Sequence, residues 1–423
     1  MTHDPDLERS EPLFEEDLSP GLSVGEPHTP PTQPPLQHSP AAADDSRFPP
    51  RQFPGPGWLE SVGWAALMLI LQLVVSVGFT VVAMLLIMVT GAGPGGAEGP
   101  AADAAAVVEE TATDGKAPQS EVPPLPSDPA DQTQQLLKRF QPQLQRLFPG
   151  MLALIGLVNC VYAATACRFR LGQREFRQLG WQSPSAQHLL LLLLGFVPLS
   201  MVCSSLQGVA IRWFPDSGRE LSELFGGLRH LPLPWLMLIL AVAPAIGEEL
   251  LFRGLIGRGL LARHGWWWGM GITSVMFACV HLSPAQVIGV LPLGLAIHLI
   301  YGATRSFWAP MLAHFLNNAL ASVMLKFSDP AAGVSAEATG EMFDLRLVGM
   351  SAIALVFLGA WLWTTRVRFV NPDGLEWNPA EANCGVPNRE SEFQLVSQRP
   401  FVWQVAGALT SLAGLLWLCV QPS

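Results

Sequence analysis

Long apolar stretches separated by polar segments dominate the chain. A helix needs about 20 mostly apolar residues to cross a hydrocarbon core of about 30 Å. Nine stretches approach or exceed that length, and two of them, 149–167 and 266–282, are near the lower limit. The nine are 62–89, 149–167, 186–206, 232–252, 266–282, 285–303, 307–325, 346–364 and 400–420. The pattern predicts an all-α fold, a polytopic transmembrane helical bundle of eight or nine spans.

The polar segments divide the chain. The N-terminal segment is rich in proline and acidic residues and has almost no apolar periodicity, which is typical of disorder. Leucines at helical spacing before residue 148 predict an interfacial helix, interrupted at Pro142. The predicted divisions are a disordered arm at 1–56, a first span within 57–90, a polar loop with the interfacial helix at 91–147, a transmembrane core at 148–325, and C-terminal spans at 326–423 with a polar loop at about 367–399.

Composition agrees with a membrane protein. Half of the 423 residues are apolar, 14% are charged, and the mean hydropathy is +0.33. The net charge of -10 comes largely from acidic groups in 1–56 and 97–132, and no basic groove is apparent, so we expect no nucleic-acid partner. The six cysteines include no CxxC pair, which argues against a disulfide framework or a thiolate metal site. Nothing in the sequence indicates an oligomeric state.

Arginines favour one orientation of the chain in the membrane. Short loops rich in Lys and Arg stay on the cytoplasmic side. On one side of the predicted bundle, the loops and span ends contain Arg168, Arg170, Arg174, Arg177, Arg253, Arg258, Arg263, Arg305, Arg366 and Arg368. With nine spans, this bias predicts a multi-pass integral membrane protein with a cytoplasmic N-terminus.

Two adjacent carboxylates interrupt the fourth apolar stretch. A charge in a span costs about 2.5–3.5 kcal/mol on insertion scales. Glu249 and Arg253 are four residues apart, so on a helix they face each other as an ion pair. Glu248 is rotated by about 100° and has no local cation, which suits a general base. The alternative is a helix end at the membrane interface with both glutamates in the headgroup region.

Two further polar clusters lie on later spans. His281 ends the segment FACVHL, where it could also be a headgroup contact or a packing residue. His314 and Asn318 are four residues apart on one helix face, where they could also hold helices together, as Asn317 is expected to do. Together, a carboxylate, two imidazoles and an amide provide a general base, proton carriers and oxyanion donors, with water as the nucleophile.

The three clusters resemble the motifs of the CAAX-protease and bacteriocin-processing (CPBP or Abi) family of intramembrane endopeptidases. They are Glu248-Glu249-x-x-x-Arg253, Phe277-x-x-x-His281 and His314-x-x-x-Asn318, in the family's order. The resemblance covers about 232–322. It implies that Glu248 activates the hydrolytic water with help from His281, and that His314 and Asn318 support the oxyanion. Glu249 and Arg253 would be structural, and the substrate would be a membrane-anchored protein or peptide in the lipid bilayer.

A zinc ion is the alternative to a metal-free site. Glu248, His281 and His314 would then hold it with a water in the fourth position. We favour no cofactor, because one glutamate would otherwise have to act both as ligand and as base.

Two other classes of protein remain open. A proton-coupled transporter also places Glu and His inside spans, where His298 adds an imidazole. A non-catalytic scaffold or immunity protein would keep the fold without needing the four polar residues together.

Depth in the membrane is the main difficulty for an assembled site. If spans simply alternate, Glu248 and His281 lie toward opposite sides of the membrane. The fourth helix must therefore be long or tilted, to about Gly257, to bring Glu248 to mid-depth.

Overall fold

The computed structural model describes residues 55–90, 129–327, 344–377, 385–387 and 390–421. The disorder predicted for 1–56 and most of the polar loop that follows the first span lie outside these residues.

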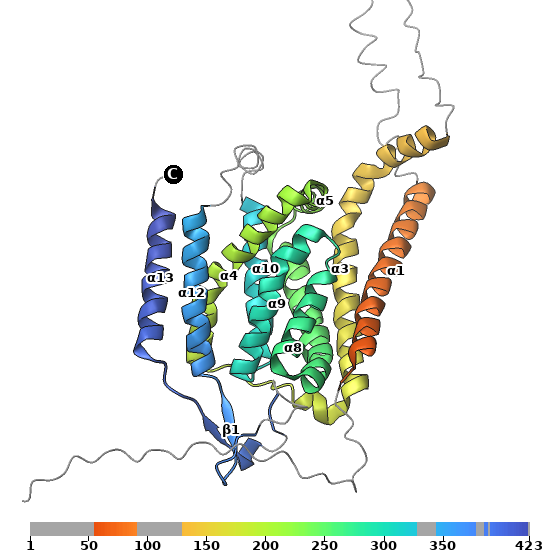
Figure 1. The fold of residues 1–423 in the computed structure, drawn as a ribbon. Helices are drawn as coiled ribbons and strands as arrows, with labels where there is room; N and C mark the ends of the chain where they lie inside the picture. Colours follow the sequence, from red (N-terminus) through yellow and green to blue (C-terminus); the bar gives the residue numbers. More distant parts are fainter. Residues whose placement is uncertain (1–54, 91–128, 328–343, 378–384, 388–389, 422–423) are drawn as a thin grey trace, which may run out of the picture.

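The described residues form a helical bundle with one small sheet, which confirms the predicted fold class (Figure 1). The α-helices are α1 Trp58–Thr90, α3 Pro129–Arg177, α4 Ala186–Trp213, α5 Pro215–Gly226, α6 Leu233–Leu236, α7 Ala243–Glu249, α8 Arg258–Cys279, α9 Pro284–Thr304, α10 Trp308–Phe327, α12 Leu345–Thr364 and α13 Val402–Val420. Two π-helical segments, η1 Met237–Val242 and η2 Leu250–Gly257, flank α7, and η4 Glu390–Glu392 is a 3-10 turn.

The number of spans differs from the prediction of eight or nine. Among the described residues, seven helical stretches are long and apolar enough to cross a membrane. One of them, Leu233–Cys279, contains two of the predicted spans. α10 is helical as predicted but is not among the seven, since His314, Asn317 and Asn318 make its centre polar.

A sharp turn divides the long stretch Leu233–Cys279 into two arms. Gly265 has φ 75° and ψ 175°, a conformation that glycine adopts at little cost. A Cβ on Gly269 would lie 2.5 Å from the Cα of Leu261, so the backbones touch on either side of the turn. Phe252 and Phe277, nearly equidistant from Gly265, also stack edge to face. Residues 233–264 and 266–279 therefore form a helical hairpin.

The hairpin removes the predicted difficulty with depth. Glu248 lies 17 residues before Gly265 and His281 lies 16 residues after it. Nearly equal lengths of chain therefore separate them from the turn, and Phe277 of the second arm contacts both Arg253 and His281. Glu248 is also near the middle of the first arm, which begins at Leu233. The first arm continues through Gly257 to the turn, so the helix is longer than the prediction required.

The predicted arginine-rich loops gather at one end of the bundle. Arg170 and Arg263 both donate to the Gly55 carbonyl, at 3.2 Å each. Arg258 donates to Gln178 Oε1 at 2.6 Å. β1 lies at this end of the bundle, whereas the C-terminus lies at the opposite end (Figure 1). The chain therefore enters α1 at the basic end and leaves α13 at the other.

Two local expectations need correction. The helix predicted around 136–147 is the first part of α3, which continues from Pro129 without a break at Pro142. A position of that part on the membrane surface stays a prediction. The polar loop at about 367–399 also contains a two-stranded antiparallel sheet of β1 Arg368–Val370 and β2 Gln394–Val396. Strands of three residues are too short to give a clear alternating pattern.

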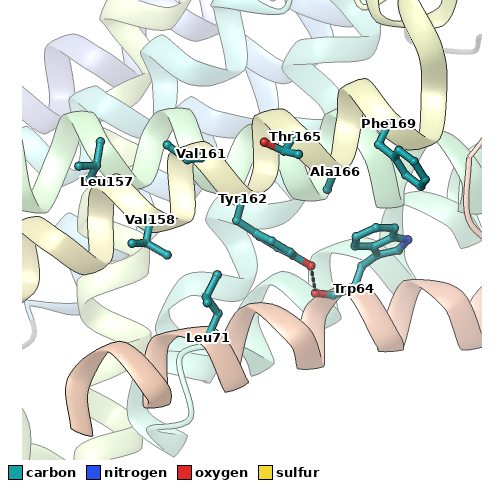
Figure 2. A pocket seen from close by; sticks show the side chains of 9 residues that line it. All are labelled: Trp64, Leu71, Leu157, Val158, Val161, Tyr162, Thr165, Ala166 and Phe169. Atoms are coloured by element: carbon teal, nitrogen blue, oxygen red, sulfur yellow. Dashed lines mark hydrogen bonds between the residues drawn. The ribbon is translucent and has the colours of Figure 1, made fainter. Parts of the chain in front are cut away.

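α3 has two faces of different character. One face and α1 line an apolar groove of about 440 Å³ (Figure 2). The groove is lined by Trp64, Leu71, Leu157, Val158, Val161, Tyr162, Thr165, Ala166 and Phe169. The opposite face contacts the first arm of the hairpin: Cys160 Sγ donates to the Ala243 carbonyl at 3.3 Å and Cys167 Sγ to the Leu250 carbonyl at 2.9 Å.

The hairpin can be tested at two glycines of its second arm. We expect Gly269→Ala to lower the Tm of the detergent-solubilised protein, because its Cβ would meet backbone atoms that cannot move aside, at a cost of about 1–3 kcal/mol. Gly271→Ala is the matched control, since a Cβ there has no neighbour within 4 Å. Alanine at Gly271 should leave the Tm unchanged or raise it. Equal Tm values for the two variants would contradict the close approach.

Candidate active site

The Phe277 ring connects the three motifs. Its side chain is fully buried, and the guanidinium carbon of Arg253 lies 4.3 Å from the ring centroid. The rings of His281 and His314 pack edge to face against it, each with a centroid separation of 5.6 Å. Residues from both arms of the hairpin and from α10 therefore meet around one aromatic side chain, as the motif order implied.

Glu249 is the centre of a buried charged cluster. Arg253 Nη1 donates to Glu249 Oε1 at 3.0 Å, and both side chains have no exposed surface, which confirms the predicted ion pair. His314 Nδ1 lies 2.8 Å from the same oxygen. Arg253 Nη2 also donates to the Gly294 carbonyl of α9 at 3.0 Å. The contact of His314 with Glu249 was not predicted, because helical spacing gives no information on contacts between helices.

Glu248 differs from its neighbour in exposure and in its charged partners. Its side chain is 17% exposed, and Oε2 is buried without a hydrogen-bond partner. It forms no ion pair with Lys or Arg in the described part of the chain, as expected. Oε2 lies 3.9 Å from His314 Nε2, which is too long for a direct hydrogen bond. The two nitrogens of one imidazole thus face the two carboxylates.

His281 lies in the turn between α8 and α9. Its Nδ1 is 3.2 Å from the Phe277 carbonyl oxygen, which can only accept a hydrogen bond. Nδ1 is therefore the protonated nitrogen of the neutral ring, and Nε2 can accept a proton. The next residue, Leu282, has φ 61°, a left-handed conformation that is costly for leucine. Within the described residues, His281 has no hydrogen bond to Glu248 or His314. Phe277 is the side chain that the two histidines share.

Asn318 and Asn317 have different partners. Asn318 Nδ2 donates to the Leu240 carbonyl of η1 at 3.0 Å, and its Oδ1 accepts from Asn317 at 3.2 Å. Ser200 of α4 donates to Asn317 Oδ1 at 2.8 Å, so Asn317 connects helices as expected. Asn318 does not contact His314 by a hydrogen bond here. Its support of an oxyanion stays a prediction.

His298 is a neighbour of Arg253 in a small space that neither Glu248 nor Glu249 lines. It is 1% exposed, its Nδ1 has no hydrogen-bond partner, and it lines a small space with Arg253, Gly257 and Tyr301. It has no hydrogen bond to Glu248 or Glu249 among the described residues. His298 therefore belongs to the packing around Arg253 and not to the cluster that faces Glu248.

The alternative zinc set does not form a ready-made site. Among the described residues, no group of three or more His, Cys, Asp and Glu side chains is arranged to hold a metal ion. Glu248 and His314 approach each other, but His281 is joined to them only through Phe277. These side chains do not fit a three-ligand zinc centre in this arrangement.

Comparison with known proteins agrees with this geometry. Residues 230–320 match the family model "Type II CAAX prenyl endopeptidase Rce1-like". The chain is also 25% identical over 176 residues to the "Putative membrane peptidase YdiL" of Bacillus subtilis (strain 168), an alignment that covers 41% of this chain and 71% of the relative. No solved structure gives a significant match.

The matched region contains both arms of the hairpin, α9 and the polar half of α10. Residues 230–320 are therefore similar to a family of CAAX prenyl endopeptidases, and they lie within a multi-pass integral membrane protein. α1, α3, α4, α12 and α13 lie outside the match.

The buried cluster gives a stability prediction. Arg253→Met leaves Glu249 as a buried charge without its cation, and removal of one partner of such a pair typically costs about 3–5 kcal/mol. We expect a clear fall in Tm, or no folded protein. The double variant Arg253→Met/Glu249→Gln should recover part of the loss, because no unpaired charge remains. If the double variant is less stable than the single variant, the ion pair does not explain the loss.

Proposed function

We propose that this protein is an intramembrane endopeptidase that hydrolyses a peptide bond in a membrane-associated protein or peptide. The observation that carries the proposal is the Glu248 carboxylate: it has an oxygen without a partner, it faces His314, and it lies halfway along a buried helical arm. Glu249 also has an oxygen without a partner, Oε2, but its Oε1 is held by both Arg253 and His314, whereas Glu248 forms no ion pair with Lys or Arg among the described residues.

Glu248 is proposed as the general base. It takes a proton from water, and the hydroxide attacks the carbonyl carbon of the scissile bond. The tetrahedral intermediate then collapses with cleavage of the C–N bond, and the proton held by Glu248 passes to the leaving nitrogen. His281 assists this transfer through Nε2, which accepts a proton in the tautomer fixed by the Phe277 carbonyl.

His314 is proposed to stabilise the oxyanion. Its Nδ1 lies 2.8 Å from Glu249 Oε1, and a proton on Nε2 would provide a donor to the oxyanion. Asn318 would supply the second donor through the Nδ2 hydrogen that does not bind the Leu240 carbonyl. Glu249 and Arg253 hold the cluster in place. This scheme uses no metal ion or other cofactor.

Prenylated C-terminal tails are the first substrates to test. The matching family is described as CAAX prenyl endopeptidases, and the matched relative as a membrane peptidase. We propose substrates that reach the site from the bilayer, because Glu248 lies on a helical stretch that is long and apolar enough to span it. Peptides with other lipid anchors are the natural comparison.

Cleavage by the Glu248→Gln variant tests the proposal. In proteoliposomes with a farnesylated, quenched-fluorescent peptide, we expect cleavage to fall by about 10²–10⁴ because glutamine cannot accept the proton. Glu220→Gln, an exposed carboxylate of α5 outside the site, is the matched control. Unchanged cleavage by Glu248→Gln would exclude Glu248 as the base. A proton flux that depends on Glu248, without cleavage, would indicate a carrier.

Chelation tests the metal-free scheme. We expect cleavage by the parent protein to survive exhaustive treatment with EDTA or 1,10-phenanthroline. A loss of activity that added Zn²⁺ restores would show that the residues rearrange to bind zinc.

The orientation of the chain can be tested separately. We propose that the basic end of the bundle, where α1 begins, faces the cytoplasm. An N-terminal tag should then be protected from external protease in intact cells, and a C-terminal tag should be cleaved. The reverse result would invert the proposed topology.

A further inference from the structure

Asn159 is an intramembrane amide that the proposed mechanism does not use. It lies near the middle of the span Arg146–Gln173 within α3. Its Oδ1 is buried and has no hydrogen-bond partner. A buried polar atom without a partner costs about 1–3 kcal/mol, and in lipid no bulk water relieves that cost. An apolar residue would serve packing better at this position.

The α3 backbone at Asn159 is in direct contact with the helix that bears Glu248. A Cβ on Gly247 would lie 3.3 Å from the Asn159 carbonyl carbon and 3.5 Å from the Asn159 Cβ. Gly247 directly precedes Glu248 in the chain. The next residue of α3, Cys160, donates to the Ala243 carbonyl, one turn earlier on the same helix. Asn159 therefore lies on the hairpin face of α3, next to the proposed base.

The other face of α3 shows that this placement is specific. Val158 and Tyr162 point toward α1, and Leu157 and Val161 also line the apolar groove (Figure 2). The Tyr162 hydroxyl is satisfied there, since it donates to the Trp64 carbonyl at 2.7 Å. The unsatisfied amide is thus on the side of the candidate active site and not on the side that faces α1.

A peptide substrate has the hydrogen-bonding groups that can pair with the Asn159 carboxamide. Every backbone N–H and C=O of a peptide drawn into the membrane needs a hydrogen-bond partner. A carboxamide offers one acceptor and two donors, which match the N–H and C=O of a peptide unit. Glu248 cannot fill this role while it takes a proton from water. Two oxygens without partners, Oδ1 of Asn159 and Oε2 of Glu248, thus occur on touching helices.

We propose that Asn159 binds the substrate backbone, with Oδ1 accepting a peptide N–H close to the scissile bond. This inference rests on the proposed endopeptidase function and adds a substrate-binding residue from α3, outside the region that matches the family. The substrate then lies alongside the contact between α3 and the first arm of the hairpin. Asn159 positions the peptide and takes no part in proton transfer.

Kinetics in proteoliposomes with the farnesylated, quenched-fluorescent peptide test this inference. Asn159→Leu keeps the size of the side chain and removes its hydrogen-bonding groups. We expect KM to rise about tenfold, equivalent to about 1.4 kcal/mol, with kcat within about twofold. Thr165→Val, which removes a polar group from the groove face of the same helix, should leave both constants unchanged.

A modified peptide identifies the contact. N-methylation at successive backbone positions should reveal one position where KM for the parent rises about tenfold, while KM for Asn159→Leu does not rise further. That non-additivity is the signature of a direct interaction. The Tm of Asn159→Leu should equal or exceed that of the parent, since the variant loses an unsatisfied polar group. A purely structural asparagine would lower the Tm instead.

The outcomes separate the two proposals. If the parent cleaves the peptide and Asn159→Leu has the KM of the parent, or a lower Tm, the inference about Asn159 is wrong and the endopeptidase function stands. If the parent cleaves none of the lipidated peptides, the endopeptidase function itself is overturned, and the inference about Asn159 with it.

Discussion

The Glu249 carboxylate, shared by Arg253 and His314, is the interaction on which the arrangement of the site depends. All three side chains are almost completely buried, so each charge relies on the other two for the solvation that water would otherwise provide. Because the residues come from the first arm of the hairpin and from α10, the requirement fixes one helix against the other. The same constraint positions Glu248, because it is the residue next to Glu249 and faces the second nitrogen of the His314 imidazole.

Several features were predictable because they depend on spacing along a single helix. The spans follow from runs of apolar residues, and the Glu249–Arg253 pair follows from four-residue spacing on one helix face. The same reasoning separated the paired glutamate from the unpaired one. Asn317 also behaves as its position off the His314–Asn318 face suggested.

Contacts between helices could not be predicted in the same way. The bond between His314 and Glu249 joins residues 65 positions apart, and nothing in either local pattern specifies it. Nor did the spacing show that Asn318 would bind the Leu240 carbonyl. The hairpin was not predicted, because a single glycine at position 265 does not by itself specify a sharp turn. The count of spans differed because this stretch contains two predicted spans and because the centre of α10 is polar.

The turn at Gly265 has a consequence for how much the region can vary in length. The two arms place Glu248 and His281 level with each other because nearly equal numbers of residues separate them from the glycine. One residue inserted into either arm would rotate everything beyond it by about 100° and shift it by about 1.5 Å. Such an insertion in the first arm, between Arg253 and Gly265, would change the register of Glu248 relative to Phe277 and His281 on the second arm. Loops that join other helices have no such constraint, whereas the length of the segment from Glu248 to His281 is fixed by the need to keep its two ends level.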